Sequence, residues 1–274
     1  MTHFRNDMEN HDFFDTNIVC SIVIYEWANE LSIIDFKHIF DWISQLVGTA
    51  PDSIQLAESE AKYKSYKWKY FEKNNVINRR EWDLIAYHWF RNIETKSGIR
   101  VYCVASTRSF RRLGIYIDEA AVVDVIGVMK QISRTIIEKV EPIYGYGAMQ
   151  SYLDGPLEYA RGINVTTYYS HENIFSQADV DTRERISAFG SEFRKNKRRL
   201  NEKLRDVEVI NYISAGHLAG IVDGMTLEDW IISGNRGTLN KEGEATWVWR
   251  IPDEHERSQI RTDLIRSGLL VVTI

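Results

Sequence analysis

The fold is decided by the stretch from Leu113 to Gly147, whose sequence is LGIYIDEAAVVDVIGVMKQISRTIIEKVEPIYGYG. Apolar residues alternate with others as far as Asp118, which is the period of a half-buried strand. Asp118 can cap a following helix, because a carboxylate there accepts hydrogen bonds from the first turn. Apolar residues then recur at steps of three and four up to Val140, and Pro142 ends the helix before a Tyr/Gly strand. The stretch predicts one strand–helix–strand unit without a reactive side chain at its strand ends.

The same mixture of strands and helices continues on both sides of this unit. Residues 18–24 form a continuous apolar run that suits a buried strand. A helix follows, with Ser32 and Asp35 as a capping box and Gly48 at its end. We further predict an aromatic strand around residues 63–70, strands at 99–105, 165–169, 207–213, 247–251 and 269–274, and helices at 78–90, 156–161, 181–205, 226–233 and 253–266.

The composition favours one compact domain. The chain has 274 residues, of which 44% are hydrophobic, so it can bury a full core. Residues 1–16 look like a flexible polar tail, and no Pro/Gly/Ser-rich linker divides the remainder. We predict a single α+β domain over residues 17–274, with α/β as the alternative class. Its mixed sheet would be built from strand–helix–strand units, and the domain could consist of two similar halves.

Charge and cysteine content narrow the class of protein. The net charge is −5, which gives no general attraction for nucleic acid or for an anionic membrane. The two cysteines, Cys20 and Cys103, lie in apolar runs and suit reduced core thiols. The N-terminus shows no signal peptide, and no apolar stretch approaches the ~20 residues that span a bilayer. We expect a cytoplasmic protein that does not enter a membrane.

One short pattern resembles a metal-dependent nuclease. Asp52 is followed by Glu60 and Lys62, and in such enzymes an Asp and a Glu bind Mg²⁺ while a Lys steadies the attacking water. The segment around Glu60 has weak strand propensity, although the chemistry needs Glu and Lys on a strand. A solvated loop is the favoured interpretation, and the nuclease stays open as an alternative.

Other catalytic patterns are missing from the sequence. The seven histidines stand singly, without the spacing of a zinc site, and His38 and His88 fall on predicted amphipathic helices. There is no G-x-S-x-G elbow and no phosphate-binding glycine loop. We therefore expect no catalytic residue, no metal and no cofactor.

A basic run is a candidate binding feature on the predicted helix 181–205. Its positive residues are Arg194, Lys195, Lys197, Arg198, Arg199, Lys203 and Arg205. Such a run can track a phosphate backbone, but acidic residues interrupt it. A solvated helix face is the favoured interpretation, followed by an acidic protein partner and then by nucleic acid, which we regard as the weakest of the three.

Aromatic residues are a second candidate binding feature. Trp68, Tyr70, Trp82 and Trp89 are expected to be shared between core and surface. Protein interfaces are enriched in aromatic and arginine residues. The predicted partner-binding residues are therefore Trp68 and Tyr70 together with Arg194, Arg198 and Arg199.

In element order the chain resembles the immunity proteins of bacterial toxin systems, in particular the type VI immunity-like group that includes the immunity-protein-52 type. The resemblance rests on the strand and helix of residues 18–48, the strand–helix–strand unit of residues 113–147, the segment Val209–Gly216 and the hairpin sequence Thr246-Trp247-Val248-Trp249. The charged helix 181–205 departs from the family. The resemblance implies a non-enzymatic protein that binds a cognate toxin and blocks its active site. An unrelated interaction or regulatory module and a Mg²⁺-dependent nuclease are the alternatives.

Overall fold

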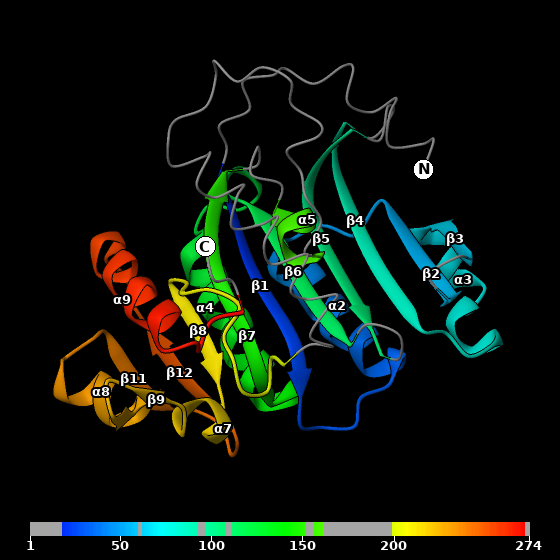
Figure 1. Cartoon of the computed structure of the whole chain (residues 1–274). Helices are drawn as coiled ribbons and strands as arrows, with labels where there is room; N and C mark the ends of the chain where they lie inside the picture. Colours follow the sequence, from blue (N-terminus) through cyan, green and yellow to red (C-terminus); the bar gives the residue numbers. More distant parts are fainter. Residues whose placement is uncertain are drawn as a thin grey trace, which may run out of the picture. The chain divides into compact units, whose positions relative to one another are not determined.

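The computed structural model describes residues 18–59, 62–92, 97–107, 111–151, 156–161 and 199–271. Its contacts define two compact units. Figure 1 labels the helices and strands of the described residues. Unit 1 comprises Met1–Ile22 and Glu30–Arg134, and unit 2 comprises Val23–Asn29 and Thr135–Ile274. Strand β1 (Ile18–Trp27) and helix α4 (Val125–Val140) contribute residues to both units. The fold class is α+β, as the sequence predicts. The prediction of one domain with two similar halves stays a prediction.

Unit 1 contains a sheet whose strands follow the order β1-β6-β5-β4-β2-β3. The later strands are β2 (Ser53–Ser59), β3 (Lys62–Lys67), β4 (Leu84–Asn92), β5 (Ser97–Ser106) and β6 (Arg112–Asp118). The pairings of β2 with β3 and β4, of β4 with β5 and of β5 with β6 are antiparallel. Strand β3 therefore stands at the end of this series of strands.

Helix α2 (Ile33–Leu46) forms as the local sequence predicts. Ser32 and Asp35 make the capping box, and Gly48 follows the helix with a positive φ of 74°. Only a residue without a Cβ adopts that conformation at no steric cost. The helix packs on β4, where the rings of Phe40 and Tyr87 lie 5.4 Å apart. The hydroxyl of Tyr87 also donates a hydrogen bond of 2.7 Å to Asp41, so α2 is fixed by apolar and polar contacts.

The predicted helix over residues 78–90 is wrong. Residues Val76–Arg79 form a short 3₁₀ helix, η1, and Leu84–Asn92 form strand β4. The strand lies between β2 and β5, and its residues from Ile85 to Trp89 are buried on both faces. A strand that is buried on both faces has no two-residue alternation of apolar and polar side chains. His88 consequently lies on a strand, whereas His38 lies on a helix as predicted.

The strand–helix–strand stretch is confirmed, with two corrections. Strand β6 is buried at every residue from Leu113 to Asp118 instead of half-buried, and the helix starts later than predicted. Asp118 caps a short 3₁₀ helix, η2 (Glu119–Ala121), by accepting from the N–H of Ala120. The long helix α4 begins only at Val125, where Asp124 accepts a hydrogen bond of 2.8 Å from Gly127 N–H. A second aspartate thus provides the cap that the sequence assigns to the first.

Unit 2 contains strands in the order β11-β12-β8-β7-β1. They include β7 (Pro142–Ser151), β8 (Ile210–Ile213), β11 (Thr238–Lys241) and β12 (Trp247–Arg250), and a separate hairpin joins β9 (Ile221–Val222) to β10 (Met225–Thr226). Besides the end of α4, the described helices of this unit are α5 (Pro156–Arg161), α7 (Ala215–Leu218), α8 (Leu227–Ser233) and α9 (Glu254–Arg266). The predicted helices at 156–161, 226–233 and 253–266 and the strand at Trp247 are confirmed.

A close approach between two strands of unit 2 explains one glycine. A Cβ on Gly145 of β7 would lie 2.5 Å from the carbonyl oxygen of Val23 and 2.5 Å from Ile24 Cδ1. Both partners belong to the part of β1 in unit 2. Gly145, in the Tyr-Gly-Tyr-Gly sequence of β7, is therefore required for packing, because any side chain there would push the two strands apart.

One prediction near the C-terminus needs correction. Residues 162–198 lie outside the described residues, and so do most of the predicted helix 181–205 and the predicted strand 165–169. The described end of that helix, Leu200 to Arg205, forms turns and bends instead. Leu204 N–H donates to Leu269 C=O at 2.9 Å, and Leu204 C=O accepts from Val271 N–H at 2.7 Å. These bonds form an isolated parallel bridge between Leu204 and Leu270, in the described part of the predicted strand 269–274. Residues 272–274 lie outside the described residues.

Candidate binding surface

Residues 63–70, at the junction of β3 and helix α3 (Trp68–Lys73), form an exposed surface that we call the β3–α3 surface. Tyr63 is 60% exposed and Tyr70 is 50% exposed. Figure 1 shows α3 beside β2 and β3 of unit 1. The aromatic strand predicted around residues 63–70 is confirmed only to Lys67, because Trp68 and Tyr70 belong to α3.

The aromatic residues of this surface are ordered by ring contacts. The rings of Tyr66 and Tyr70 stack at 6.1 Å with an angle of 1° between their planes. Trp68 is half-buried and contacts the rings of Phe71 at 6.2 Å and Tyr87 at 5.6 Å. Trp68 therefore anchors α3 to the core of unit 1, while Tyr70 remains available at the surface.

The β3–α3 surface is basic within an acidic chain. Lys64, Lys67 and Lys69 are exposed, and Glu72 is the first acidic residue after them. The chain as a whole carries a net charge of −5. The exposed tyrosines are of a residue type that is enriched at protein interfaces. The three lysines between them would give charge complementarity to an acidic partner.

The residues of the nuclease-like pattern are only partly described. The Asp52 carboxylate accepts a hydrogen bond of 2.8 Å from the N–H of Phe90, at the point where β2 meets β4. Lys62 begins β3, and Glu60 lies outside the described residues. Within the described ranges, no group of three or more His, Cys, Asp or Glu side chains is placed to hold a metal ion. The carboxylate of Asp52 thus has a structural partner, and the alternative of a metal site with Glu60 and Lys62 stays untested.

The predicted basic run is divided by the structure. Arg194 and Arg198 lie outside the described residues. Arg199 is exposed and forms an ion pair of 2.9 Å with Glu202. Arg205 differs from the predicted solvated helix face, because only 1% of its surface is exposed. Its interpretation as a surface residue is therefore wrong.

Arg205 lies in a cage of tyrosines within unit 2. Its Nη1 atom donates hydrogen bonds of 3.1 Å to the hydroxyls of Tyr25 and Tyr146. The Tyr159 ring lies under the guanidinium, with 3.2 Å between Arg205 Cζ and the ring centroid. The backbone N–H of Arg205 donates to the Tyr144 hydroxyl. A guanidinium stays charged at every relevant pH, so the cage compensates for the cost of burying this charge.

Two carboxylates complete the surroundings of Arg205. Tyr159 donates a hydrogen bond of 2.6 Å to Glu208, and Asp206 pairs with Arg261 at 2.6 Å. Burial, followed by the negative charge of Asp206, raises the pKa of Glu208 from 4.5 to about 7. We call this set, Tyr25, Tyr144, Tyr146, Tyr159, Arg205, Asp206, Glu208 and Arg261, the Arg205 cluster. Its hydrogen bonds fix the loop before β8.

Ser214 and His217 lie 3.0 Å apart, the spacing of a nucleophile and its base. His217 Nδ1 also accepts from the backbone N–H of Ser214 at 3.2 Å, and Nε2 bonds to the carbonyl of Leu200 at 2.9 Å. The pair thereby forms the capping box of α7. Burial lowers the pKa of His217 to about 4, so the ring is neutral at pH 7. These bonds assign His217 a structural role.

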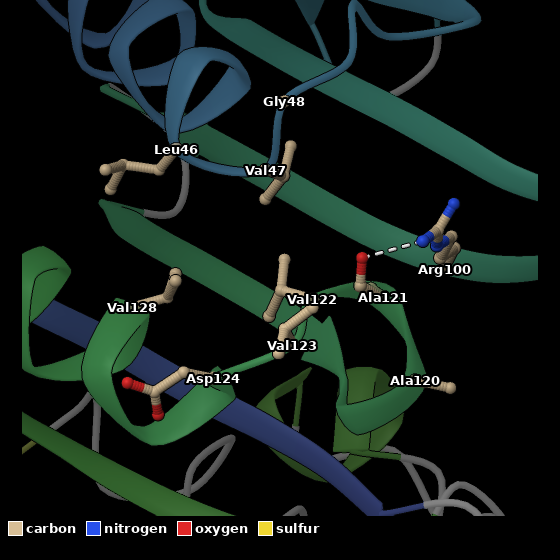
Figure 2. Close-up of a pocket in the computed structure, with 10 residues that line it drawn as sticks. All are labelled: Leu46, Val47, Gly48, Arg100, Ala120, Ala121, Val122, Val123, Asp124 and Val128. Atoms are coloured by element: carbon tan, nitrogen blue, oxygen red, sulfur yellow. Dashed lines mark hydrogen bonds between the residues drawn. The ribbon is translucent and has the colours of Figure 1, made fainter.

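A pocket of about 530 Å³ in unit 1 is mainly apolar (Figure 2). Its charged residues are already used by the fold: Arg100 donates to the carbonyl of Ala121 at 2.7 Å, and Asp124 caps α4. The lining residues are Leu46, Val47, Gly48, Arg100, Ala120, Ala121, Val122, Val123, Asp124 and Val128. Polar groups for a reaction do not converge there among these residues.

The cysteines agree with the sequence analysis. Cys20 and Cys103 are both buried free thiols of unit 1. Burial, followed by the charge of Glu119, raises the pKa of Cys20 to about 11, and burial also raises that of Cys103. Protonated thiols are poor nucleophiles. Both residues therefore serve the core.

Parts of the candidate surface and of the buried polar cluster were not predicted from the sequence. Tyr63 and Tyr66 join the β3–α3 surface, and the alternation of lysine and tyrosine before Trp68 is a signal that could have identified them. The Arg205 cluster had no such signal, since Tyr25 and Arg205 are 180 residues apart.

No helix in the described ranges has both the length and the apolar character needed to cross a membrane.

Comparisons with known proteins find similarity in structure but none in sequence. No protein-family model and no curated protein sequence matches the chain. Among solved structures, the fold is similar to that of the Pseudomonas aeruginosa T6SS protein PA0821, with a TM-score of 0.51 and 12% sequence identity. The match covers 93% of this chain and 73% of that one. At this identity the likeness shows that the two proteins share a fold.

Proposed function

We propose that this chain is an immunity-type protein of a type VI secretion system, which binds a cognate toxin and blocks its active site. The observation that carries the proposal is the fold likeness to a T6SS protein over 93% of the chain. The element order that resembles the immunity-protein-52 type, recognised in the sequence, supports the same function independently of that structure.

The surface chemistry supports a binding function. Exposed tyrosines and lysines lie together on the β3–α3 surface. Interfaces of standard size reach high affinity through a few such anchors. Tyr63 and Tyr70 are the proposed anchors, and Trp68 is proposed to support Tyr70 from below through α3. The proposal includes a cytoplasmic location.

Growth protection tests this function. The protein encoded immediately upstream of the gene of this chain would be tested as the toxin, by expression in a bacterial host with and without the full chain. We expect growth arrest by the toxin alone and normal growth when both proteins are present. A non-cognate toxin under the same promoter is the control, and it should arrest growth in both cases. Equal arrest by the cognate toxin with and without the chain would refute the proposal.

A purified assay separates occlusion from other mechanisms. The toxin's activity should fall in proportion to added chain and reach its minimum at equal molar amounts, because a bound inhibitor acts stoichiometrically. Metal-dependent cleavage of nucleic acid by the purified chain, lost in Asp52→Ala and Glu60→Ala, would instead support the nuclease alternative. Destruction of the toxin at substoichiometric amounts of chain would also contradict occlusion.

A further inference from the structure

The backbone of β3 is placed to pair with a further strand. β3 is the terminal strand in the order of the unit 1 sheet and pairs with β2 alone among the described strands. A terminal strand leaves one row of N–H and C=O groups outside the sheet, and such a row is a template for strand addition. The exposure of Tyr63, Lys64 and Ser65 agrees with an open edge.

The side chains of β3 carry positive charge on both faces of the sheet. Tyr66 and Lys64 pair with Ile54 and Leu56 and share their face. Lys67 pairs with Ser53, one residue from Ile54, and therefore points to the opposite face. A strand added beside β3 would meet lysine on each face, together with tyrosine.

We infer that the β3–α3 surface binds an extended acidic segment of the partner protein, which adds to β3 as a further strand. This inference rests on the proposed function and specifies the chemistry of the partner. Carboxylates on alternate faces of the added segment would lie beside Lys64 and Lys67, within the range of cross-strand pairs. The stacked rings of Tyr66 and Tyr70 would cover one face of that segment.

Two other occupants fit the surface less well. A second copy of the chain would bring lysine-rich edges together, and like charges directly opposite each other destabilise a sheet. Nucleic acid would use the lysines and tyrosines but not the backbone of β3, and the net charge of −5 would oppose its approach. An acidic protein strand is the occupant that uses charge, rings and backbone together.

Binding of the purified full chain to the toxin domain encoded beside its gene tests the inference by calorimetry. We expect Tyr70→Ala to weaken binding by about tenfold or more, as for an aromatic anchor. Lys64→Glu should weaken it by about three- to tenfold and reduce its salt dependence. Lys130→Glu is the matched control, because Lys130 is an exposed lysine of unit 1 on α4, and it should stay within about twofold of the original affinity.

Hydrogen exchange on the unaltered protein gives a second readout that does not depend on how a variant folds. Amides of residues 62–67 should exchange more slowly in the complex. The inference would be overturned if the toxin binds while hydrogen exchange in β3 is unchanged and the Lys64→Glu and Lys130→Glu variants have equal affinities for it. That result would leave the proposed function intact. No toxin binding at all would refute both.

The alternative occupants have their own outcomes. Dimerisation of the chain in light scattering, abolished by Lys64→Glu, would assign the edge to a second copy. Binding of a mixed-sequence single-stranded oligonucleotide that is stronger than toxin binding, and is lost in Lys64→Glu, would assign it to nucleic acid. Either result would overturn the inference.

Discussion

The guanidinium carbon of Arg205 lies 3.2 Å from the centre of the Tyr159 ring, and both residues are buried. Cation–π contacts are worth most when water is excluded from them. The Tyr159 hydroxyl also donates a hydrogen bond to the Glu208 carboxyl. Tyr159 therefore contacts the guanidinium with its ring and Glu208 with its hydroxyl. This arrangement connects α5 to the loop before β8 within unit 2.

Replacement of Arg205 should destabilise the protein strongly. Arg205→Met keeps the length of the side chain but leaves the hydroxyls of Tyr25 and Tyr146 without their donor, so we expect a loss of ~3 kcal/mol. Arg205→Lys keeps the charge without the planar fork and should lose ~1–2 kcal/mol. Urea unfolding followed by circular dichroism measures both. Arg199→Ala is the control at an exposed ion pair, and it should change stability by less than ~0.5 kcal/mol. Equal unfolding midpoints for Arg205→Met and the original chain would contradict the role of the cage.

The carboxyl of Glu208 should make stability fall as pH rises. Its pKa is raised from 4.5 to about 7, chiefly by burial, so the folded state binds the proton more tightly than the unfolded state. The resulting stabilisation is complete below pH 4.5 and is lost as pH rises through 7. Glu208→Gln should therefore gain ~1–3 kcal/mol relative to the original chain at pH 8, and much less at pH 5. Urea titrations at the two pH values test this, and an equal difference at both would disprove it.

His217 should act in the opposite direction. Burial lowers its pKa from 6.5 to about 4, so the unfolded state binds the proton first as pH falls. Stability from the neutral ring is complete above pH 6.5 and is lost as pH falls towards 4. In the His217→Asn variant we expect no such loss of stability in acid. At pH 7 the variant should be less stable by ~1–2 kcal/mol, because the hydrogen bond to the Leu200 carbonyl is lost. Thermal unfolding between pH 4 and 7 is the measurement, and an unchanged pH slope in the variant would count against the assignment.

Gly145→Ala should destabilise the protein more than the addition of a single methyl group would suggest. The new methyl would lie 2.5 Å from the carbonyl oxygen of Val23, a backbone atom that cannot turn away. Overpacking of this kind costs ~1–3 kcal/mol. Gly147→Ala is the matched control two residues along β7, where the nearest atom, Ile210 Cβ, would be 3.2 Å away. Thermal melting should rank the original chain first, Gly147→Ala second and Gly145→Ala last, and any other order of the two variants would reject the explanation.

Prediction from the sequence succeeded where the signals are local. The capping box of Ser32 and Asp35 and the periodic apolar residues of α2 lie within a few turns of each other, and the helix follows them. The strand–helix–strand stretch has the same property. The error at its helix start, the cap at Asp118 instead of Asp124, concerns a choice between two aspartates six residues apart that are both suited to cap a helix. The full burial of β6, which was predicted to be half-buried, depends on distant elements.

Prediction failed where distant parts of the chain decide the structure. Strand β4 shows aromatic residues at helical spacing, but it lies between β2 and β5, and packing on both of its faces, by α2 on one, removes the alternation that marks a strand. Arg205 ends a basic run that suits a solvated surface. Its burial depends on tyrosines from β1, β7 and α5, and no local pattern contains them.

The division of β1 has a consequence for how the chain is made. Unit 2 uses Val23–Asn29, but the rest of that unit begins only at Thr135. During synthesis the chain emerges from its N-terminus. This short segment must therefore wait, already outside the ribosome, until strand β7 has been translated. A protein cut between Arg134 and Thr135 would separate Val23–Asn29 from the remainder of unit 2, so neither fragment would carry that unit whole.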